Sequence, residues 1–261
     1  MIISGLNEFR GKRVLMLQGP VGPFFSRLAA DLSLAGAVVF KVNFNGGDWL
    51  FSRRATFERI FNFVGDIAQW PDYFDDLLQR LGIDTVLLFG DCRPVHVSAM
   101  PAIRRRHLSL GVFEEGYLRP DYITLERDGV NNNSSLPDDP RFYLAQGLRK
   151  LPESRPLGSV YGDAAKWGMI YFFAASVGRL WFRRYQHHRR LGVSDAPWWW
   201  LSFLRKALYR VAERDVMPRL VAENSDNYFL VSLQMQGDAQ MSVHSAFKCV
   251  EDFIVHTISS F

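Results

Sequence analysis

Residues 13–25, RVLMLQGPVGPFF, join a short apolar run to a turn rich in glycine and proline. Apolar residues then recur at helical spacing as far as Ala35, and Gly36 follows as a helix terminator. A strand, a turn and a helix in this order begin a βαβ unit, in which the strands run parallel. The opening of the chain therefore predicts a parallel sheet with helices packed on it.

The same pattern recurs along the first half of the chain. It predicts buried strands at 13–17, 37–42, 85–89 and 108–113, each followed by polar and glycine residues. A short alternating strand and an Asn-rich turn are predicted at 123–135. Ligands of open α/β sheets bind outside the carboxyl ends of the strands, so the candidate site lies along that edge. The turn at 19–23 has two interpretations, a phosphate-binding loop or a tight connection, and it lacks the G-x-G-x-x-G spacing.

The second half of the chain has a different organisation. Proline punctuates 137–156, the segment 167–217 is typical of helices and rich in tryptophan and arginine, and a strand at 227–233 is predicted before a helix at 245–259. We expect domains at 1–155, 156–222 and 223–261. A single strand and helix cannot bury both faces of the strand, so further strands are expected after the last residue.

Composition narrows the class of protein. The chain has 261 residues, of which 48% are hydrophobic, a net charge of +4 and two cysteines. Two cysteines are too few for a thiolate metal cluster or a disulfide framework, and no apolar run reaches the roughly 20 residues of a membrane-spanning helix. No Asp-x-Asp pair or His/Cys cluster follows a predicted strand, so no metal is implied. We expect a cytoplasmic globular protein with a basic face.

Two acidic motifs follow predicted strands. One is Glu114-Glu115-Gly116, and the other is the segment QGDAQ at 236–240, which contains Asp238. Two carboxyl groups that face each other across a cleft suit glycosyl transfer with retention, because one can attack the anomeric carbon while the other handles the proton of the acceptor. The alternative is that the glutamates are solvated loop charges and that Asp238 is a helix N-cap.

Four segments give the chain a family resemblance: VLMLQGPVGPFF at 14–25, KVNFNGGDWL at 41–50, LLFGDCRP at 87–94 and VFEEGYLRPDYITLE at 112–126. They resemble the β-Kdo glycosyltransferases of bacterial capsule assembly, the capsular polysaccharide export and biosynthesis family. The resemblance extends from about Arg13 to the last residue. It implies a GT-B-like α/β fold with a Rossmann-type acceptor lobe, a helical connector and the start of a Rossmann-type donor lobe.

The resemblance also implies roles for residues. Glu115 would be the general acid/base and Asp238 the nucleophile that forms a transient Kdo adduct. Donor-sugar binding is implied for the rest of the two motifs, Glu114, Gly116, Gln236 and Gln240. The donor would be CMP-Kdo, with no further cofactor. The family's His-Pro and serine/threonine motifs, which hold the cytidine monophosphate, do not follow Asp238, so the resemblance leaves open whether the chain as given is active.

An acceptor site is predicted from the other polar residues that follow strands. They offer hydrogen bonds to hydroxyls and cations for a phosphate, with salt bridges inside the fold as the alternative: Asn45, Asp48, Asp91, Arg93 and Arg119. The family's acceptor is a phosphatidylglycerol-type lipid of the inner leaflet. The resemblance therefore implies a peripheral protein at the cytoplasmic face of the inner membrane, beside other capsule assembly and export proteins.

The segment 167–210 mixes aromatic residues with arginine and has three interpretations. It could be an interfacial membrane surface, with aromatic rings at headgroup depth and arginines against anionic lipid. It could equally be a core between two lobes. A nucleic-acid surface is disfavoured because no recognised module accompanies it. For the whole chain, the alternatives to a Kdo transferase are a non-catalytic export or scaffold component and a transferase for another activated sugar.

Overall fold

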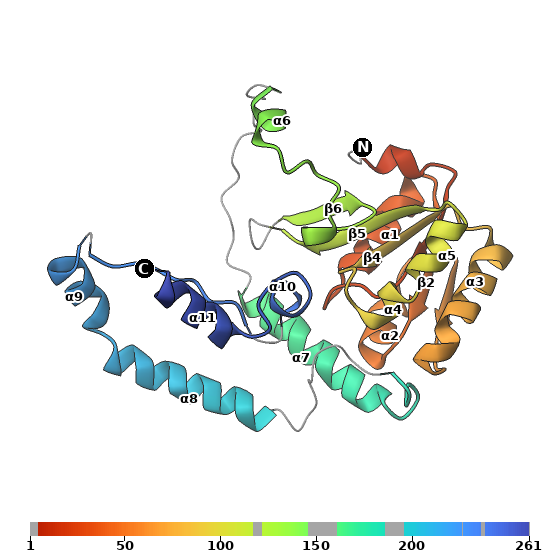
Figure 1. The fold of residues 1–261 in the computed structure, drawn as a ribbon. Helices are drawn as coiled ribbons and strands as arrows, with labels where there is room; N and C mark the ends of the chain where they lie inside the picture. The colour runs from red at the N-terminus through yellow and green to blue at the C-terminus, as the bar shows by residue number, and fades with distance from the viewer. Residues whose placement is uncertain are drawn as a thin grey trace. The chain divides into compact units, whose positions relative to one another are not determined.

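The computed structural model describes residues 5–116, 122–145, 161–185, 196–225, 227–235 and 238–260 (Figure 1). The chain forms two compact units, Met1–His188 and Arg189–Phe261. The first unit contains a six-stranded sheet, and the regular structure described in the second is helical. None of the helices within the described ranges has both the length and the hydropathy that crossing a bilayer requires.

The sheet of the first unit has the strand order β3-β2-β1-β4-β5-β6. The first five strands are parallel, and β6 is antiparallel to β5. The strands are β1 Arg13–Met16, β2 Val38–Asn43, β3 Arg59–Asn62, β4 Thr85–Phe89, β5 Ser109–Glu115 and β6 Ile123–Arg127. This arrangement confirms the predicted α/β, Rossmann-like class.

Helices cover both faces of this sheet. The α-helices of the unit are α1 Phe24–Leu34, α2 Gly46–Ser52, α3 Trp70–Leu81, α4 Pro94–Val97, α5 Met100–Arg105, α6 Pro140–Ala145 and α7 Tyr161–Gly178. Short 3-10 turns lie at Leu6–Phe9, Ile67–Gln69 and Asn131–Asn133.

Alternation along the strands builds two cores. Leu15, Leu17 and Val86 belong to a cluster that includes Phe74 and Leu77 of α3. Their neighbours in sequence point to the other face and pack with α1, in a cluster of Val14, Met16, Leu87, Phe25 and Ala29. Successive strand residues point to opposite faces, so runs that are apolar throughout become strands buried on both sides. The predicted strands 13–17, 37–42, 85–89 and 108–113 correspond to β1, β2, β4 and β5.

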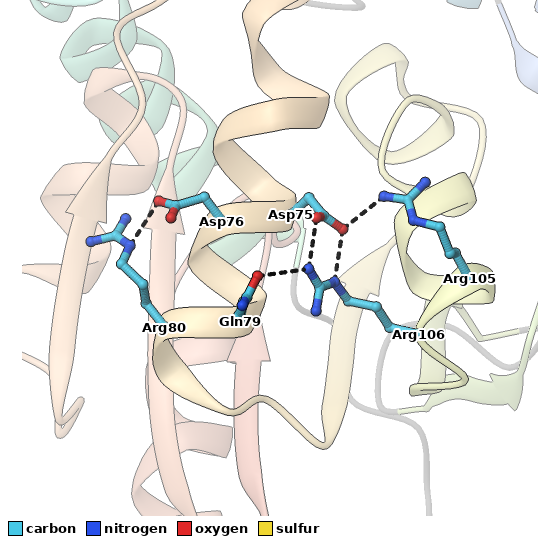
Figure 2. A network of polar contacts seen from close by, with 6 residues as sticks. All are labelled: Asp75, Asp76, Gln79, Arg80, Arg105 and Arg106. Carbon is cyan, nitrogen blue, oxygen red and sulfur yellow. Dashed lines mark hydrogen bonds and ion pairs between the residues drawn. The ribbon is translucent and has the colours of Figure 1, made fainter.

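A surface network of charged side chains links α3 to α5 (Figure 2). Arg106 donates from Nε and Nη2 to the two carboxylate oxygens of Asp75, each at 2.7 Å, and Arg105 adds a contact of 2.8 Å. These hydrogen bonds lower the pKa of Asp75 to about 2. On the same helix, Arg80 pairs with Asp76 four residues earlier, at 2.7 Å. The network fastens two helices on one face of the sheet, away from its carboxyl edge.

Sequence patterning missed one strand. β3 has only four residues, RIFN, and lies at the edge of the sheet with its end residues exposed. An edge strand has a neighbour on one side only and needs no continuous apolar run, so its pattern is weak.

Helix α7 belongs to the first unit, although a domain boundary was predicted near 155, ahead of it. It packs closely against α2, since a Cβ atom placed on Gly46 would lie 2.1 Å from the carbonyl oxygen of Ala174 and 2.8 Å from Cα of Gly178. Two backbones can approach this closely only where both side chains are absent or small. The compact unit accordingly extends to His188.

The second unit contains α8 Ala196–Ala212, α9 Val216–Glu223, α10 Ala239–Ser242 and α11 Val250–Ser259. The strand predicted at 227–233 is wrong: residues 227–235 have no regular secondary structure and are exposed. A parallel strand needs hydrogen-bonded neighbours and helices on both faces, and the described part of this unit provides no partner strand. The helix predicted at 245–259 forms over the shorter span of α11.

Candidate active site at the carboxyl edge of the sheet

The order of the strands places a topological switch point at the carboxyl ends of β1 and β4. From β1 the chain leads to β2 on one side, and β4 lies on the other side. Such a switch point is the usual ligand site of an open α/β sheet. Gln18 follows β1 and Gly90 follows β4, and Phe89 N–H donates to the carbonyl oxygen of Gln18 at 3.2 Å. The polar residues singled out in the sequence lie on both sides of this point.

On the β2 side, Asn45 and the first turn of α2, as far as Asp48, form a buried socket for α7. Asn45 Oδ1 accepts the backbone N–H of Asp48 at 2.9 Å and so caps α2. Asn45 Nδ2 donates to the Tyr171 hydroxyl at 2.9 Å, and that hydroxyl donates to Asp48 Oδ1 at 3.2 Å. The backbone N–H of Phe44 donates to the other oxygen of Asp48 at 3.1 Å.

These contacts define what the socket does. Asn45 and Asp48 are 3% and 5% exposed, so neither presents its polar atoms to solvent. Their hydrogen bonds hold α2 and α7 together. The acceptor-binding role expected for both residues stays a prediction, while the structure shows a positioning role for each.

Two more buried polar residues adjoin the socket, and sequence patterning missed both. Lys41 Nζ donates to the carbonyl oxygens of Leu17 at 2.9 Å and Val42 at 2.5 Å. Burial lowers the pKa of Lys41 to about 8, although Asp48 opposes the shift. Gln18 donates to the Tyr185 hydroxyl at 2.7 Å and also contacts Asp48 Oδ2 at 3.3 Å. For Lys41 the sequence did contain an indication, because a lysine inside the apolar run 37–44 is costly to bury unless its charge is paired.

The turn at 19–23 lies beneath α7. A Cβ atom on Gly22, whose φ is +109°, would lie 3.5 Å from Cβ of Trp167. A small pocket adjoins the turn, with Gly19, Ser26, Lys41 and Tyr171 among its lining residues. α1 begins here without a side-chain cap. The turn thus serves as a strand-to-helix connection packed under a helix, and phosphate binding there stays a prediction.

On the β4 side, Asp91 and Arg93 also make internal contacts. Asp91 Oδ2 accepts the backbone N–H of Val130 at 3.2 Å and Asn133 Nδ2 at 3.1 Å, which fastens the segment after β6. Arg93 is half-buried and donates from Nη1 to the carbonyl oxygen of Gly19 at 2.9 Å. Arg119, the fifth member of the predicted acceptor set, lies outside the described residues.

The acidic motif closes β5. Glu114 is half-buried and Glu115, the last residue of the strand, is exposed. The register pairs Glu115 with Ile123 of β6. At the third position, a Cβ atom on Gly116 would lie 2.2 Å from the carbonyl oxygen of Tyr122. Glycine is therefore required where the chain passes close to the start of β6. The motif thus consists of two carboxylate residues and a glycine that is needed for steric reasons.

The surroundings of Glu114 change its acidity. Burial raises the pKa of Glu114, while the backbone N–H of Glu115, which donates to Glu114 Oε1 at 2.9 Å, and the nearby Arg93 oppose the shift. A raised carboxyl pKa is common at acid/base sites. Nearby, His96 is fully buried, its Nδ1 lies 2.6 Å from the carbonyl oxygen of Gly90, and burial lowers its pKa to about 3. His96 is therefore neutral at physiological pH.

The second motif lies in the second unit. The backbone carbonyl of Asp238 accepts the N–H groups of Met241 and Ser242, each at 3.0 Å, and so starts α10. Asp238 therefore lies at the start of a helix, which is the position that the alternative interpretation, a helix N-cap, predicts for it. Gln236 lies outside the described residues, as does the side chain of Gln240. The meeting of Asp238 with Glu115 across a cleft stays a prediction, because the two belong to different units.

Comparison with known proteins decides the family. The profile described as "Capsule polysaccharide biosynthesis protein" matches residues 84–261, which is more than half of the chain. The chain belongs to this capsule polysaccharide biosynthesis family. The matched part begins at β4 and includes Arg93, Glu115 and Asp238, so both acidic motifs of this family member lie within it.

Curated relatives match almost the whole chain. The Capsule polysaccharide export protein KpsS of Escherichia coli is 38% identical over 256 residues, which are 96% of this chain and 64% of that protein. The Capsule polysaccharide modification protein LipB of Neisseria meningitidis is 35% identical over 258 residues, or 96% of this chain and 61% of LipB. This family member thus spans less than two thirds of the length of these relatives.

Among solved structures, an epimerase from Methanothermobacter thermautotrophicus aligns with 41% of this family member and 52% of its own chain. The sequence identity is 14% and the TM-score is 0.25, which supports no argument about fold or function.

Proposed function

We propose that this chain acts in capsule assembly as a glycosyltransferase that moves Kdo from CMP-Kdo, with retention, to a phosphatidylglycerol-type lipid or to a Kdo already on it. Membership of the capsule polysaccharide biosynthesis family supports the process. The chemistry is inferred from the two acidic motifs. The observation that carries it is the pair Glu114 and Glu115 at the carboxyl end of β5, on the edge where ligands of such sheets bind.

Each step of the proposed reaction uses a group of this chain. The carboxylate of Asp238 attacks the anomeric carbon of Kdo, and the bond to the phosphate of CMP breaks, which leaves an acyl-linked Kdo adduct and free CMP. Glu115 then takes the proton of the acceptor hydroxyl, whose oxygen attacks the same carbon and displaces Asp238. Two inversions give net retention. An exposed carboxylate such as Glu115 is accessible to an acceptor that arrives from solvent.

Glu114 has a supporting role in this proposal. It is half-buried beside the reacting carboxylate, and its pKa is raised by burial. Arg93 provides a positive charge near both Glu114 and Asp48. A fixed cation at this edge suits an acceptor that carries a phosphodiester, because ion pairs of arginine with phosphate are strong and directional.

The test is a transfer assay with CMP-Kdo and a phosphatidylglycerol acceptor, using the protein in the length at which the cell makes it. Glu115→Gln and Asp238→Asn should each lower kcat by about 10²–10⁴-fold while the folded state is retained. Glu58→Gln and Asp215→Asn, at two exposed acids of the same units, are matched controls and should leave kcat unchanged. Full activity in either motif variant would contradict the proposed roles.

A second candidate is a non-catalytic component of capsule export, since the relative from Escherichia coli is named an export protein. It predicts that cells carrying Glu115→Gln and Asp238→Asn still produce capsule at the normal level. A transferase for another sugar predicts activity with a different donor, so the same assay repeated with a panel of activated sugars separates it from the Kdo enzyme.

A further inference from the structure

Helix α7 is apolar on two opposite faces. Its inner face is buried against α2 and the glycine turn through Trp167, Tyr171, Ala174 and Gly178, spaced at three and four residues. Phe51 packs against this face, with ring centroids 5.6 Å from Trp167 and 6.3 Å from Tyr171. Amphipathic helices normally expose a polar face to solvent. A helix that is apolar all round is expected to have a nonpolar environment on its second face as well.

The outer face continues past the end of the helix as a stripe of exposed apolar side chains. Its members are between 45% and 68% exposed: Met169, Phe173, Val177, Leu180 and Trp181. Most recur at helical spacing, and Phe173 lies two residues from Tyr171, so it points about half a turn away from the inner face. Contiguous exposed apolar patches of this kind mark interaction surfaces.

The charges around this outer stripe are almost all positive. Residues 161–185 contain Lys166, Arg179, Arg183 and Arg184 against the single acid Asp163. Arg184 pairs with Asp66 at 2.8 Å, and Lys166 lies over the ring of Trp167 at 5.1 Å. Arg179 and Arg183 are exposed at the end of the stripe where Leu180 and Trp181 lie. Apolar side chains bordered by arginine fit a surface that is negatively charged outside and nonpolar inside.

We propose that the outer stripe of α7 docks on a bilayer of anionic lipid. The aliphatic and aromatic side chains enter the headgroup region, and Arg179 and Arg183 contact the phosphates. α7 then lies along the membrane, while its inner face fixes the sheet to it through the socket at Asn45–Asp48. This deepens the proposed function by naming the surface that would hold the protein beside a lipid acceptor.

The test is flotation of the full chain with vesicles of phosphatidylglycerol and phosphatidylcholine, compared with pure phosphatidylcholine. Binding should require the anionic lipid and weaken with salt. The double variant Phe173→Gln/Trp181→Gln should reduce partitioning about tenfold or more. Arg179→Ala and Arg183→Ala should each reduce it about fivefold. Leu34→Gln and Arg104→Ala, at exposed positions elsewhere in the unit, serve as matched controls and should bind like the wild type.

The results that overturn the proposal are distinct. The proposal is wrong if the wild type binds neither kind of vesicle, or if the stripe variants bind anionic vesicles as well as the wild type does. A lower Tm of the stripe variants without lipid, or a change in their sedimentation, would show that protein covers the stripe, either this chain or a second copy. The flotation assay contains no sugar donor. A failure of docking therefore leaves the transfer assay unaffected, and an inactive protein can still bind vesicles.

Discussion

The two halves of the carboxyl edge differ in what their polar residues do. Beside β2, the side chains of Asn45 and Asp48 are buried, and their hydrogen bonds reach helix α7. At the end of β5, Glu114 is half-buried and Glu115 is exposed. Both sets lie at the carboxyl ends of strands of one sheet. The difference shows that position at this edge does not by itself define a site, because a later helix can occupy part of the edge.

The largest expected effect is on the stability of the fold, and it comes from the half beside β2, where α7 packs. Asp48→Ala removes the carboxylate that accepts a hydrogen bond from the Tyr171 hydroxyl and that favours the charged form of Lys41, and so leaves this buried cation without that counter-charge. We expect the free energy of unfolding to fall by about 3–5 kcal/mol, measured by urea denaturation. Glu115→Gln, at the exposed end of β5, should change it by less than about 0.5 kcal/mol.

Asp31→Ala is the matched control for Asp48→Ala, because it removes an exposed aspartate from α1. Equal losses of stability in the Asp48 and Glu115 variants would remove the distinction between the two halves.

A smaller effect concerns the pH dependence of stability. The pKa of Lys41 is about 8 in the folded protein and 10.5 in the unfolded chain. Between these values the unfolded chain keeps a proton that the folded chain has released, so this residue makes stability rise with pH, by about 3 kcal/mol over the window. Lys41→Met should lack this rise.

The measurement is urea denaturation of wild type and Lys41→Met at pH 7, 8, 9 and 10. Only the difference between the two proteins is compared, because burial also raises the pKa of Tyr171 and Tyr185 in the folded protein, so ionisation of these tyrosines in the unfolded chain lowers stability towards pH 10. Parallel pH profiles of the two proteins would show that the buried amine does not change its charge in this window.

The smallest effect is expected away from the edge, at Asp75 (Figure 2). Its pKa of about 2 lies below the ordinary value of 3.8, so its pairing stabilises the fold above about pH 4 and is lost as the pH falls towards 2. Asp75→Asn should lower Tm slightly at pH 7 and not at pH 2, because surface ion pairs contribute little. A change in transfer activity would contradict a purely structural role for this network.

The local pattern of apolar residues was sufficient to predict most strands of the first unit. Strands buried on both faces read as apolar runs, which is why β1, β2, β4 and β5 were predictable. β3 was not, because a short edge strand carries exposed residues. The strand expected at 227–233 shows the opposite error: its composition suits a strand, but the described residues of the unit provide no neighbour for it to pair with.

The site was predictable in position and less so in the roles of its residues. The edge itself follows from the strand pattern. Whether Asp48 faces solvent depends on Tyr171, which is more than 120 residues later and lies on a helix that is apolar on both faces. Composition cannot tell such a helix from an ordinary core helix. The buried roles of Lys41 and Gln18 depend on the same packing.

The central claim is that Glu115 and Asp238 act on one Kdo. The most direct measurement is peptide mass mapping of Glu115→Gln protein after incubation with CMP-Kdo and acceptor. Without the base, the second displacement is slowed, so the account predicts that a single Kdo accumulates on the peptide containing Asp238, and that Asp238→Asn abolishes it. Complete turnover with no trapped sugar, or a Kdo attached to a different peptide, would contradict the account.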